Sequence, residues 1–172
     1  QWMGAGLSHY LEHLVAGGTT TKQAESDYRR IIDSLGGVSN AYTTYDHTAY
    51  YIMSSSENAP LALKVLYEWM GHADWTNEEY EREQGVVLKE MERAKSNVAR
   101  EIYQYTQSLY YKDSPYRYPV IGYQDVFLKS SSDELKAYYK LTYVPENMVV
   151  VVGGNISENA IIKDVQKTFG QL

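Results

Sequence analysis

The pentapeptide HYLEH, residues 9–13, places two histidines four residues apart and a glutamate directly before the second histidine. Apolar residues around it recur at helical spacing and a glycine pair follows, so we predict a helix over about residues 5–16. Residues four apart lie on one face of a helix, about one turn from each other. His9 and His13 can therefore both reach one zinc ion, with Glu12 at the border of the same face.

The order His-x-x-Glu-His is the inverzincin signature, the reverse of the better-known His-Glu-x-x-His arrangement. A zinc ion held by the two histidines would lower the pKa of a bound water toward ~7, and Glu12 stands where a general base can take its proton. Helical His/Glu pairs on a solvated face are also common, and two histidines alone leave zinc short of the three protein ligands of a catalytic site. The pentapeptide therefore leaves a zinc site and a solvated helix face both open.

A third ligand would have to be a carboxylate on another element, and the segment EREQGVVLKE, residues 81–90, offers two. We predict that this segment lies in a long helix that begins at the N-cap Thr76 and runs past residue 100. Glu83 and Glu90 lie two turns apart on one face, with two valines between them. A glutamate on such a half-apolar face costs free energy unless a cation compensates it. The alternative is that both glutamates belong to a charged surface stripe with the basic residues of this segment.

The remainder of the chain predicts a mixed α+β fold, because helices and strands alternate without a clear βαβ rhythm. The segment VSNAYTTYDHTAYYIMSSS, residues 38–56, is rich in β-branched and aromatic residues and predicts a β-hairpin with its turn near Tyr45-Asp46. ENMVVVVGGN, residues 146–155, predicts a strand that is buried on both faces. We expect one domain over residues 1–172, with a mixed or antiparallel sheet packed against helices. Further helices are expected over residues 21–35 and 57–73, from an N-cap at Ser132 or Asp133, and after Ser157.

The composition of the chain argues against several classes of protein. A net charge of −6 and a pI near 5.2 argue against a nucleic-acid partner. The sequence has no cysteine, so a metal site would have to use histidine and carboxylate ligands. No apolar run approaches the ~20 residues of a membrane span.

The paired motifs identify a resemblance to a known family. GLSHYLEHLVAGGT, residues 6–19, resembles the active-site helix of the pitrilysin/insulinase family of zinc metallopeptidases. EREQGVVLKE is similar to the family's second carboxylate region, in which six residues separate two glutamates. The resemblance implies that His9, His13 and Glu90 bind one Zn²⁺ ion and that Glu12 is the catalytic base. It implies that Glu83 is a supporting carboxylate outside the set of ligands.

Further stretches extend the resemblance over nearly the whole chain. SPYRYPVIGYQDV and YYKLTYVPENMVVVVGGNIS, residues 114–126 and 138–157, look like the downstream part of the same domain, especially in its bacterial members. GGVSNAYTTYDHTAYY, residues 36–51, is similar to the strand pair that follows the active-site helix in the family, so Asn40 and Ala41 would line the edge strand that receives a peptide substrate. Without the family, Asn40 is equally compatible with a turn or bulge residue. The resemblance implies the fold of mitochondrial processing peptidase, here without the strands that precede the active-site helix. It also implies a second homologous half or a partner subunit that closes the chamber.

We therefore predict a zinc-dependent endopeptidase domain that hydrolyses peptides by attack of a zinc-bound water. The first alternative is a non-catalytic structural subunit of the same fold, and the second is a peptide-binding module that uses the edge strand without turnover. We expect a bacterial protein of the periplasm or the cytoplasm, with a peptide substrate, no nucleic-acid partner and no membrane span.

Overall fold

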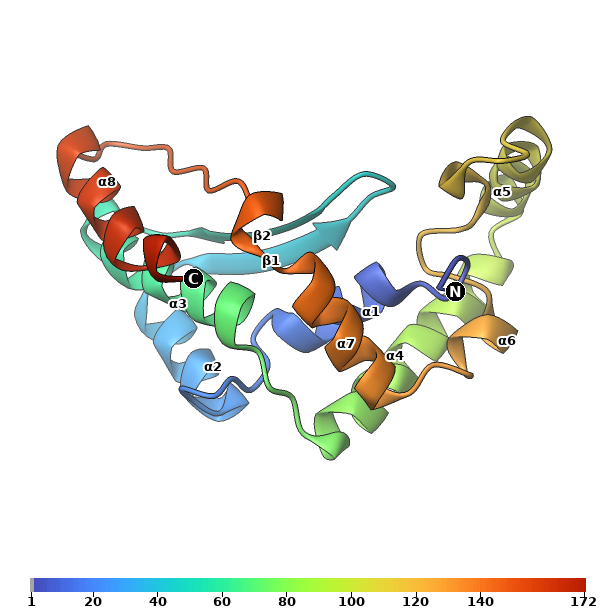
Figure 1. The fold of residues 1–172 in the computed structure, drawn as a ribbon, viewed down its shortest axis with the longest axis horizontal. Helices are drawn as coiled ribbons and strands as arrows, with labels where there is room; N and C mark the ends of the chain where they lie inside the picture. Colours follow the sequence, from blue (N-terminus) through green and yellow to red (C-terminus); the bar gives the residue numbers. More distant parts are fainter. Residues whose placement is uncertain (1) are drawn as a thin grey trace. The chain divides into compact units, whose positions relative to one another are not determined.

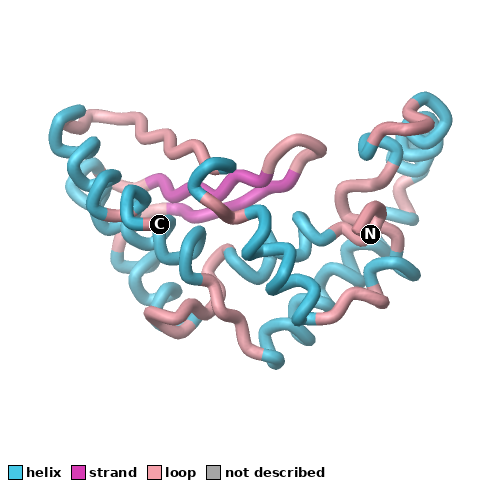
Figure 2. The backbone as a smooth tube through the Cα atoms, viewed as in Figure 1, coloured by secondary structure: helices cyan, strands magenta, loops and turns pink. Residues whose placement is uncertain are grey.

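The computed structural model describes residues 2–172, which form two compact units that interleave along the chain. Unit 1 contains the residues up to Leu14, Tyr42–Ala49 and Asn77–Tyr138, and unit 2 contains Val15–Ala41, Tyr50–Thr76 and Tyr139–Leu172. Helices dominate, and the sheet has two antiparallel strands, which confirms the predicted α+β class (Figures 1 and 2). The elements are α1 (Leu7–Val15), α2 (Glu25–Ser34), β1 (Val38–Thr43), β2 (Thr48–Met53), η1 (Ser56–Asn58), α3 (Ala59–His72), α4 (Asn77–Lys95), α5 (Val98–Tyr110), η2 (Pro115–Arg117), α6 (Gln124–Phe127), α7 (Ser132–Thr142), η3 (Pro145–Asn147), α8 (Glu158–Lys167) and η4 (Phe169–Gln171).

Unit 1 is built on the packing of α1 against α4 (Figure 1). Tyr10 is fully buried, its ring contacts Tyr80 and Phe127, and its hydroxyl donates to the Tyr80 carbonyl oxygen at 2.6 Å. Just before α1, Gly6 has a positive φ of 67°, and a Cβ there would lie 2.1 Å from the carbonyl oxygen of Ile121. These contacts fix both the start of α1 and its buried face.

The predicted β-hairpin is confirmed, and β1 and β2 pair as neighbours (Figure 2). In its turn the Thr44 amide donates to the His47 carbonyl oxygen at 2.8 Å, around the predicted Tyr45-Asp46. At the other end of the hairpin, Gly37 comes so close to Met53 that a Cβ would lie 2.0 Å from the Met53 carbonyl oxygen. Glycine is therefore required at this position by the close approach of two backbones.

The long helix predicted to run past residue 100 is divided into α4 and α5. α4 begins directly after Thr76, as expected, but ends at Lys95. Asn97 then acts as the N-cap of α5, because its side chain accepts a hydrogen bond from the Arg100 amide. The prediction failed because the pattern of apolar and charged residues that indicates a helix continues across the break between α4 and α5.

The caps predicted for α7, Ser132 or Asp133, are wrong, because the helix already begins at Ser132. Neither Ser132 nor Asp133 caps the helix: the Ser131 hydroxyl accepts from the Glu134 amide at 3.2 Å. In return, the Glu134 carboxylate accepts from the Ser131 amide at 2.9 Å. This reciprocal pair is a capping box, which satisfies two backbone donors at once.

The valine run, Val149–Val152, does not form the predicted buried strand. No strand is assigned to it in the described part of the chain, and Val149 and Val151 are 89% and 85% exposed. The prediction failed because a run of valines sets only the β propensity of a segment, whereas a strand also needs a neighbour with which to pair.

Unit 2 has its own core, which contains a buried carboxylate. Glu68 on α3 is 4% exposed and accepts hydrogen bonds from the Tyr28 hydroxyl at 2.7 Å and from the Gln23 amide at 2.9 Å. The hydroxyl of Thr20 lies 2.7 Å from that of Tyr28, whose only proton is directed to Glu68, so Thr20 is the donor. These hydrogen bonds compensate the cost of burying the carboxylate.

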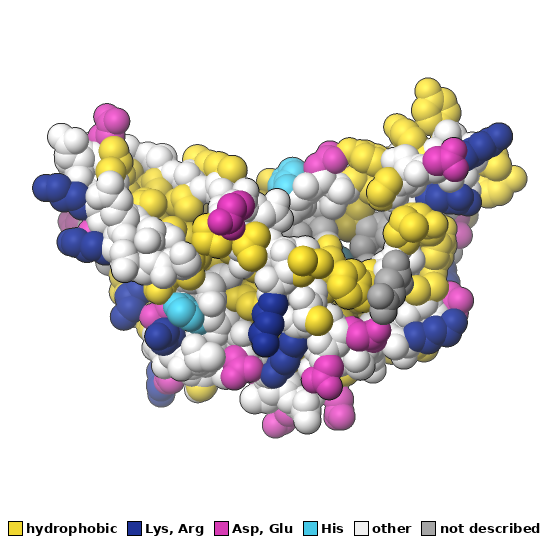
Figure 3. Space-filling view, viewed as in Figure 1, with side chains coloured by type: hydrophobic (Ala, Val, Ile, Leu, Met, Phe, Trp, Pro, Cys, Tyr) yellow, Lys and Arg dark blue, Asp and Glu magenta, His cyan; other side chains and the backbone are white. Residues whose placement is uncertain are grey.

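The helix α5 carries apolar side chains on an exposed face (Figure 3). The large exposed residues of α5 are Val98, Ile102, Tyr103, Tyr105, Leu109 and Tyr110.

None of the helices in residues 2–172 combines the length and the apolar character that a membrane span requires.

Candidate metal centre

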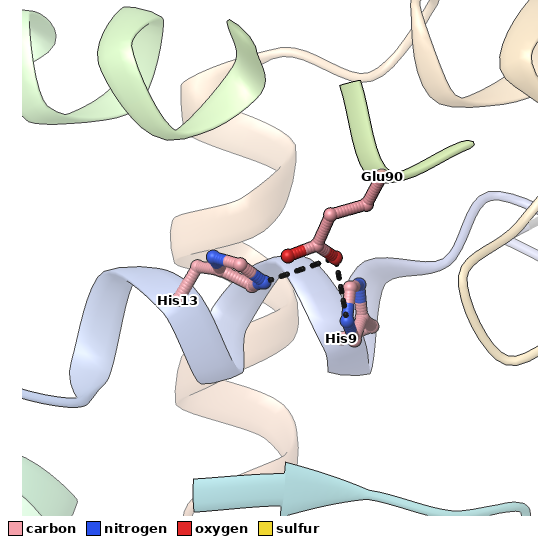
Figure 4. A group of neighbouring side chains, drawn as sticks. All are labelled: His9, His13 and Glu90. Carbon is pink, nitrogen blue, oxygen red and sulfur yellow. Dashed lines mark ion pairs between the residues drawn. The ribbon is translucent and has the colours of Figure 1, made fainter. Parts of the chain in front are cut away.

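Three residues predicted as metal ligands lie together in unit 1. His9 and His13 project from α1 toward Glu90, which projects from α4 (Figure 4). The same Glu90 oxygen, Oε2, lies 3.5 Å from His9 Nε2 and 3.6 Å from His13 Nε2. One potential ligand atom from each residue lies within 4.8 Å of the other two, so the group could hold a metal ion.

Glu83 contacts the other nitrogen of the His13 ring. Its Oε2 lies 3.3 Å from His13 Nδ1, whereas Glu90 faces Nε2 of the same ring. The second Glu83 oxygen accepts a hydrogen bond from Arg82 Nε at 2.9 Å. The two glutamates of α4 therefore occupy different positions: Glu90 lies between the two histidines, and Glu83 lies behind one of them.

The two imidazoles have different electrostatic surroundings. Burial, the proximity of His13 and the charge of Arg100 lower the pKa of His9 to about 4, so its ring is neutral at pH 7. Burial also acts to lower the pKa of His13, but the hydrogen bond with Glu83 and the charges of Glu90, Glu83 and Glu12 outweigh it and raise that pKa. The hydrogen bond with His13 in turn holds the pKa of Glu83 below its usual value.

The chemistry of these donors fits zinc. Two imidazole nitrogens and one carboxylate oxygen form one of the ligand sets found in catalytic zinc sites, which keep a further position for water. The neutral His9 ring offers a lone pair at Nε2 if its proton is on Nδ1, which is buried without a hydrogen-bond partner in the described residues. A bound dication would also attract each of the three groups, the two imidazole nitrogens and the carboxylate oxygen, directly.

Glu12 lies on the same helix, and its half-buried carboxylate accepts a hydrogen bond from another element. The Thr43 hydroxyl, at the end of β1, lies 2.5 Å from Glu12 Oε2. Thr43 is not among the residues predicted from the sequence. The sequence feature that could have indicated it is the pair of threonines that flank the hairpin turn, Thr43 and Thr48. Their hydroxyls lie 3.2 Å apart.

The predicted substrate residues Asn40 and Ala41 lie on β1, within the part of the hairpin that belongs to unit 2. Asn40 is exposed, and its side-chain oxygen accepts a hydrogen bond from the Ala41 amide at 2.9 Å. The Ala41 backbone amide must therefore leave the Asn40 side chain before it can donate a hydrogen bond to a bound peptide. The substrate-binding role of both residues stays a prediction.

Comparison with known proteins gives two family matches along the chain. Residues 2–124 match the insulinase family, peptidase family M16, and residues 129–172 match the family described as the peptidase M16 inactive domain. An uncharacterised zinc protease of Bacillus subtilis is 33% identical over 165 residues, 96% of this chain and 40% of that protein. The β subunit of the mitochondrial processing peptidase of Caenorhabditis elegans is 25% identical over 167 residues, 97% of this chain and 36% of that protein.

Solved structures confirm the predicted fold type. A protease from Helicobacter pylori matches with a TM-score of 0.90 at 28% identity, over 98% of this chain and 41% of that one. The first half of the periplasmic protease PqqL from Escherichia coli matches in fold with a TM-score of 0.87 at 23% identity, over 100% of this chain and 38% of that one. The chain therefore spans about 40% of the length of these relatives.

Proposed function

The chain belongs to the insulinase family, peptidase family M16, and on this premise we propose that it is the zinc-binding catalytic part of an endopeptidase. The observation that carries the proposal is the group of His9, His13 and Glu90, in which one carboxylate oxygen faces both imidazoles. Relatives named as zinc proteases support the choice of metal.

His9 and His13, through Nε2, and Glu90, through its carboxylate, would hold the zinc ion. When bound there, zinc supplies a Lewis acid that makes water nucleophilic near neutral pH and polarises the scissile carbonyl group. Glu83 would hold the Nδ1 proton of His13 and so keep Nε2 of that ring directed at the metal.

Glu12 would act as the general base. Its carboxylate takes a proton from water as the water oxygen bonds to the scissile carbonyl carbon. The same carboxylate then passes the proton to the amide nitrogen as the C–N bond breaks, which releases an amine and a carboxylate product. Asn40 and Ala41 would hold the peptide substrate along β1 through main-chain hydrogen bonds.

The whole protein would contain more than this chain. Relatives are about 2.5 times as long, judging from the 40% of their length that the chain covers. One structural neighbour was solved as the first half of a protease. We therefore propose that a second half, or a partner subunit, closes over the site. We also propose that the whole protein is a bacterial protein of the periplasm or the cytoplasm.

Elemental analysis of zinc per chain tests the metal site directly. We expect about one zinc per parent chain, much less in a folded Glu90→Ala variant, and the parent value in Glu92→Ala, which changes an exposed glutamate of the same helix. A folded parent that takes up no zinc would overturn the proposal.

The Glu12→Gln variant tests the chemistry separately. It should retain zinc but lose on the order of 100-fold or more in peptide hydrolysis, because the amide cannot accept the proton. If the zinc-loaded variant cleaves peptides as fast as the parent, Glu12 is not the base.

A further inference from the structure

The Glu12 carboxylate is held from outside its own helix by the tip of the hairpin. Glu12 on α1 and Thr43 at the end of β1 are 31 residues apart in sequence, yet Thr43 Oγ1 lies 2.5 Å from Glu12 Oε2. A carboxylate only accepts hydrogen bonds, so the threonine hydroxyl is the donor. A hydrogen bond of this length with an ionised acceptor belongs to the strong class.

A second threonine fixes the direction of that donor. Thr48, the first residue of β2, has its Oγ1 3.2 Å from Thr43 Oγ1. Because the single proton of Thr43 is directed to Glu12, Thr48 must donate in this contact. The two hydroxyls thus form a directed chain from Thr48 through Thr43 to Glu12, in which each hydrogen bond polarises the next.

The hairpin turn keeps the two threonines opposite each other. The Thr44 amide donates to the His47 carbonyl oxygen at 2.8 Å, and the Thr44 hydroxyl accepts from the amides of Asp46 and His47 at 3.3 and 3.2 Å. Threonine is also stiff about χ1, because it is branched at Cβ. A flexible glutamate side chain is therefore anchored by a donor that cannot itself move freely.

We propose that Thr43, oriented by Thr48, is a positioning residue that sets the direction of the Glu12 carboxylate in the reaction, an inference that rests on the proposed function. A general base must lie within about 2.6–3.2 Å of the proton that it takes, so a small displacement of its oxygen reduces the rate. With Oε2 engaged by Thr43, Oε1 of Glu12 would be the oxygen that takes the proton from water.

The hydrogen bond itself is tested without zinc by a double-mutant cycle. Thr43→Val, Glu12→Ala and the double variant are unfolded with urea in zinc-free protein, with Thr106→Val on α5 as the matched exposed control. We expect a coupling of about tenfold in the unfolding equilibrium constant between Thr43 and Glu12, and none between Thr106 and Glu12. Additive effects of Thr43→Val and Glu12→Ala would overturn the proposal.

The positioning role is tested by peptide hydrolysis in the complete zinc-loaded protein. Thr43→Val should lower kcat on the order of 10- to 100-fold with zinc content and KM unchanged, whereas Thr43→Ser, which keeps the hydroxyl, should restore it to within a few-fold of the parent. Thr48→Val should give the same loss in milder form. In the Glu12→Gln background, Thr43→Val should have no further effect on residual turnover.

The outcomes separate this inference from the function on which it rests. If Thr43→Val keeps the parent kcat, or lowers the residual rate equally with and without Glu12, Thr43 does not act through the base. A zinc-loaded parent without turnover would overturn the proposed function, and the positioning role with it, while the urea cycle would still report the hydrogen bond.

Discussion

Replacing Glu83 with glutamine tests whether the carboxylate behind His13 supports metal binding. The substitution keeps the size of the side chain and removes its charge, so the hydrogen bond to His13 Nδ1 at 3.3 Å loses its ionic component. A metal-binding imidazole is a stronger ligand when its other nitrogen donates to a carboxylate, and loss of such a partner costs 10- to 100-fold in metal affinity. We expect weaker zinc binding in Glu83→Gln.

The geometry places the effect at the lower end of that range. Two unit charges 3.3 Å apart interact with about 5 kcal/mol at an effective dielectric of 20, which is an upper bound for this pair. The side chains of Glu83 and His13 are only 15% and 17% exposed, so solvent screens the pair weakly. The separation is nevertheless longer than the 2.7–2.9 Å of strong charge-assisted bonds, and Arg82 shares the carboxylate. We therefore expect a loss of about tenfold, or about 1.4 kcal/mol.

Competition with a chromophoric zinc chelator at neutral pH measures this loss, and circular dichroism verifies the fold. Glu81→Gln is the matched control, because it makes the same change at an exposed position of α4. Equal zinc affinity in Glu83→Gln and Glu81→Gln would refute the supporting role. A loss as large as that of Glu90→Gln would instead make Glu83 a ligand.

The protonation of His13, the close backbone contact of Gly37 and the cap at Asn97 each have a measurable effect. Zinc affinity should fall about tenfold per pH unit below the raised pKa of His13 and stay level above it, because the protonated ring must lose its Nε2 proton before that nitrogen can bind zinc. Calorimetry across pH measures this, and a level profile through acid pH would contradict it. Gly37→Ala should lower the free energy of unfolding by about 1–3 kcal/mol in urea titrations, since its Cβ would meet the backbone of β2, whereas Gly85→Ala, with open space in α4, should raise it by about 0.5–1 kcal/mol. Asn97→Ala should destabilise the start of α5 by about 1 kcal/mol, seen as faster amide exchange there, and unchanged exchange would exclude the cap.

The histidine pair could be predicted from sequence because its geometry is local. His9 and His13 share a helix face by spacing alone, and the helix was confirmed over α1. The choice between Glu83 and Glu90 was not local, since both lie on one face of α4 at two-turn spacing. Only the packing of α4 against α1 shows that Glu90 lies between the imidazoles while Glu83 lies at Nδ1 of one of them.

The cap of α7 and the contact of Thr43 with Glu12 were not predicted from the sequence. The capping box at α7 was readable, because Glu134 follows Ser131 by three residues, but three consecutive serines offered competing caps. The role of Thr43 required the register of the hairpin and its distance to α1. Register is a tertiary property, and no residue type at position 43 indicates by itself which carboxylate it contacts.

The valine run has a consequence for the behaviour of the chain at high concentration. No charged residue lies between Glu146 and Glu158, and Val149 and Val151 are almost fully exposed. An uncharged, β-branched segment without proline is the type of sequence that stacks into cross-β assemblies when it has no neighbouring strand. At high concentration, pairing of this segment with a neighbouring strand therefore competes with its stacking on the same segment of another chain. Val151→Lys would introduce a charge that opposes such stacking.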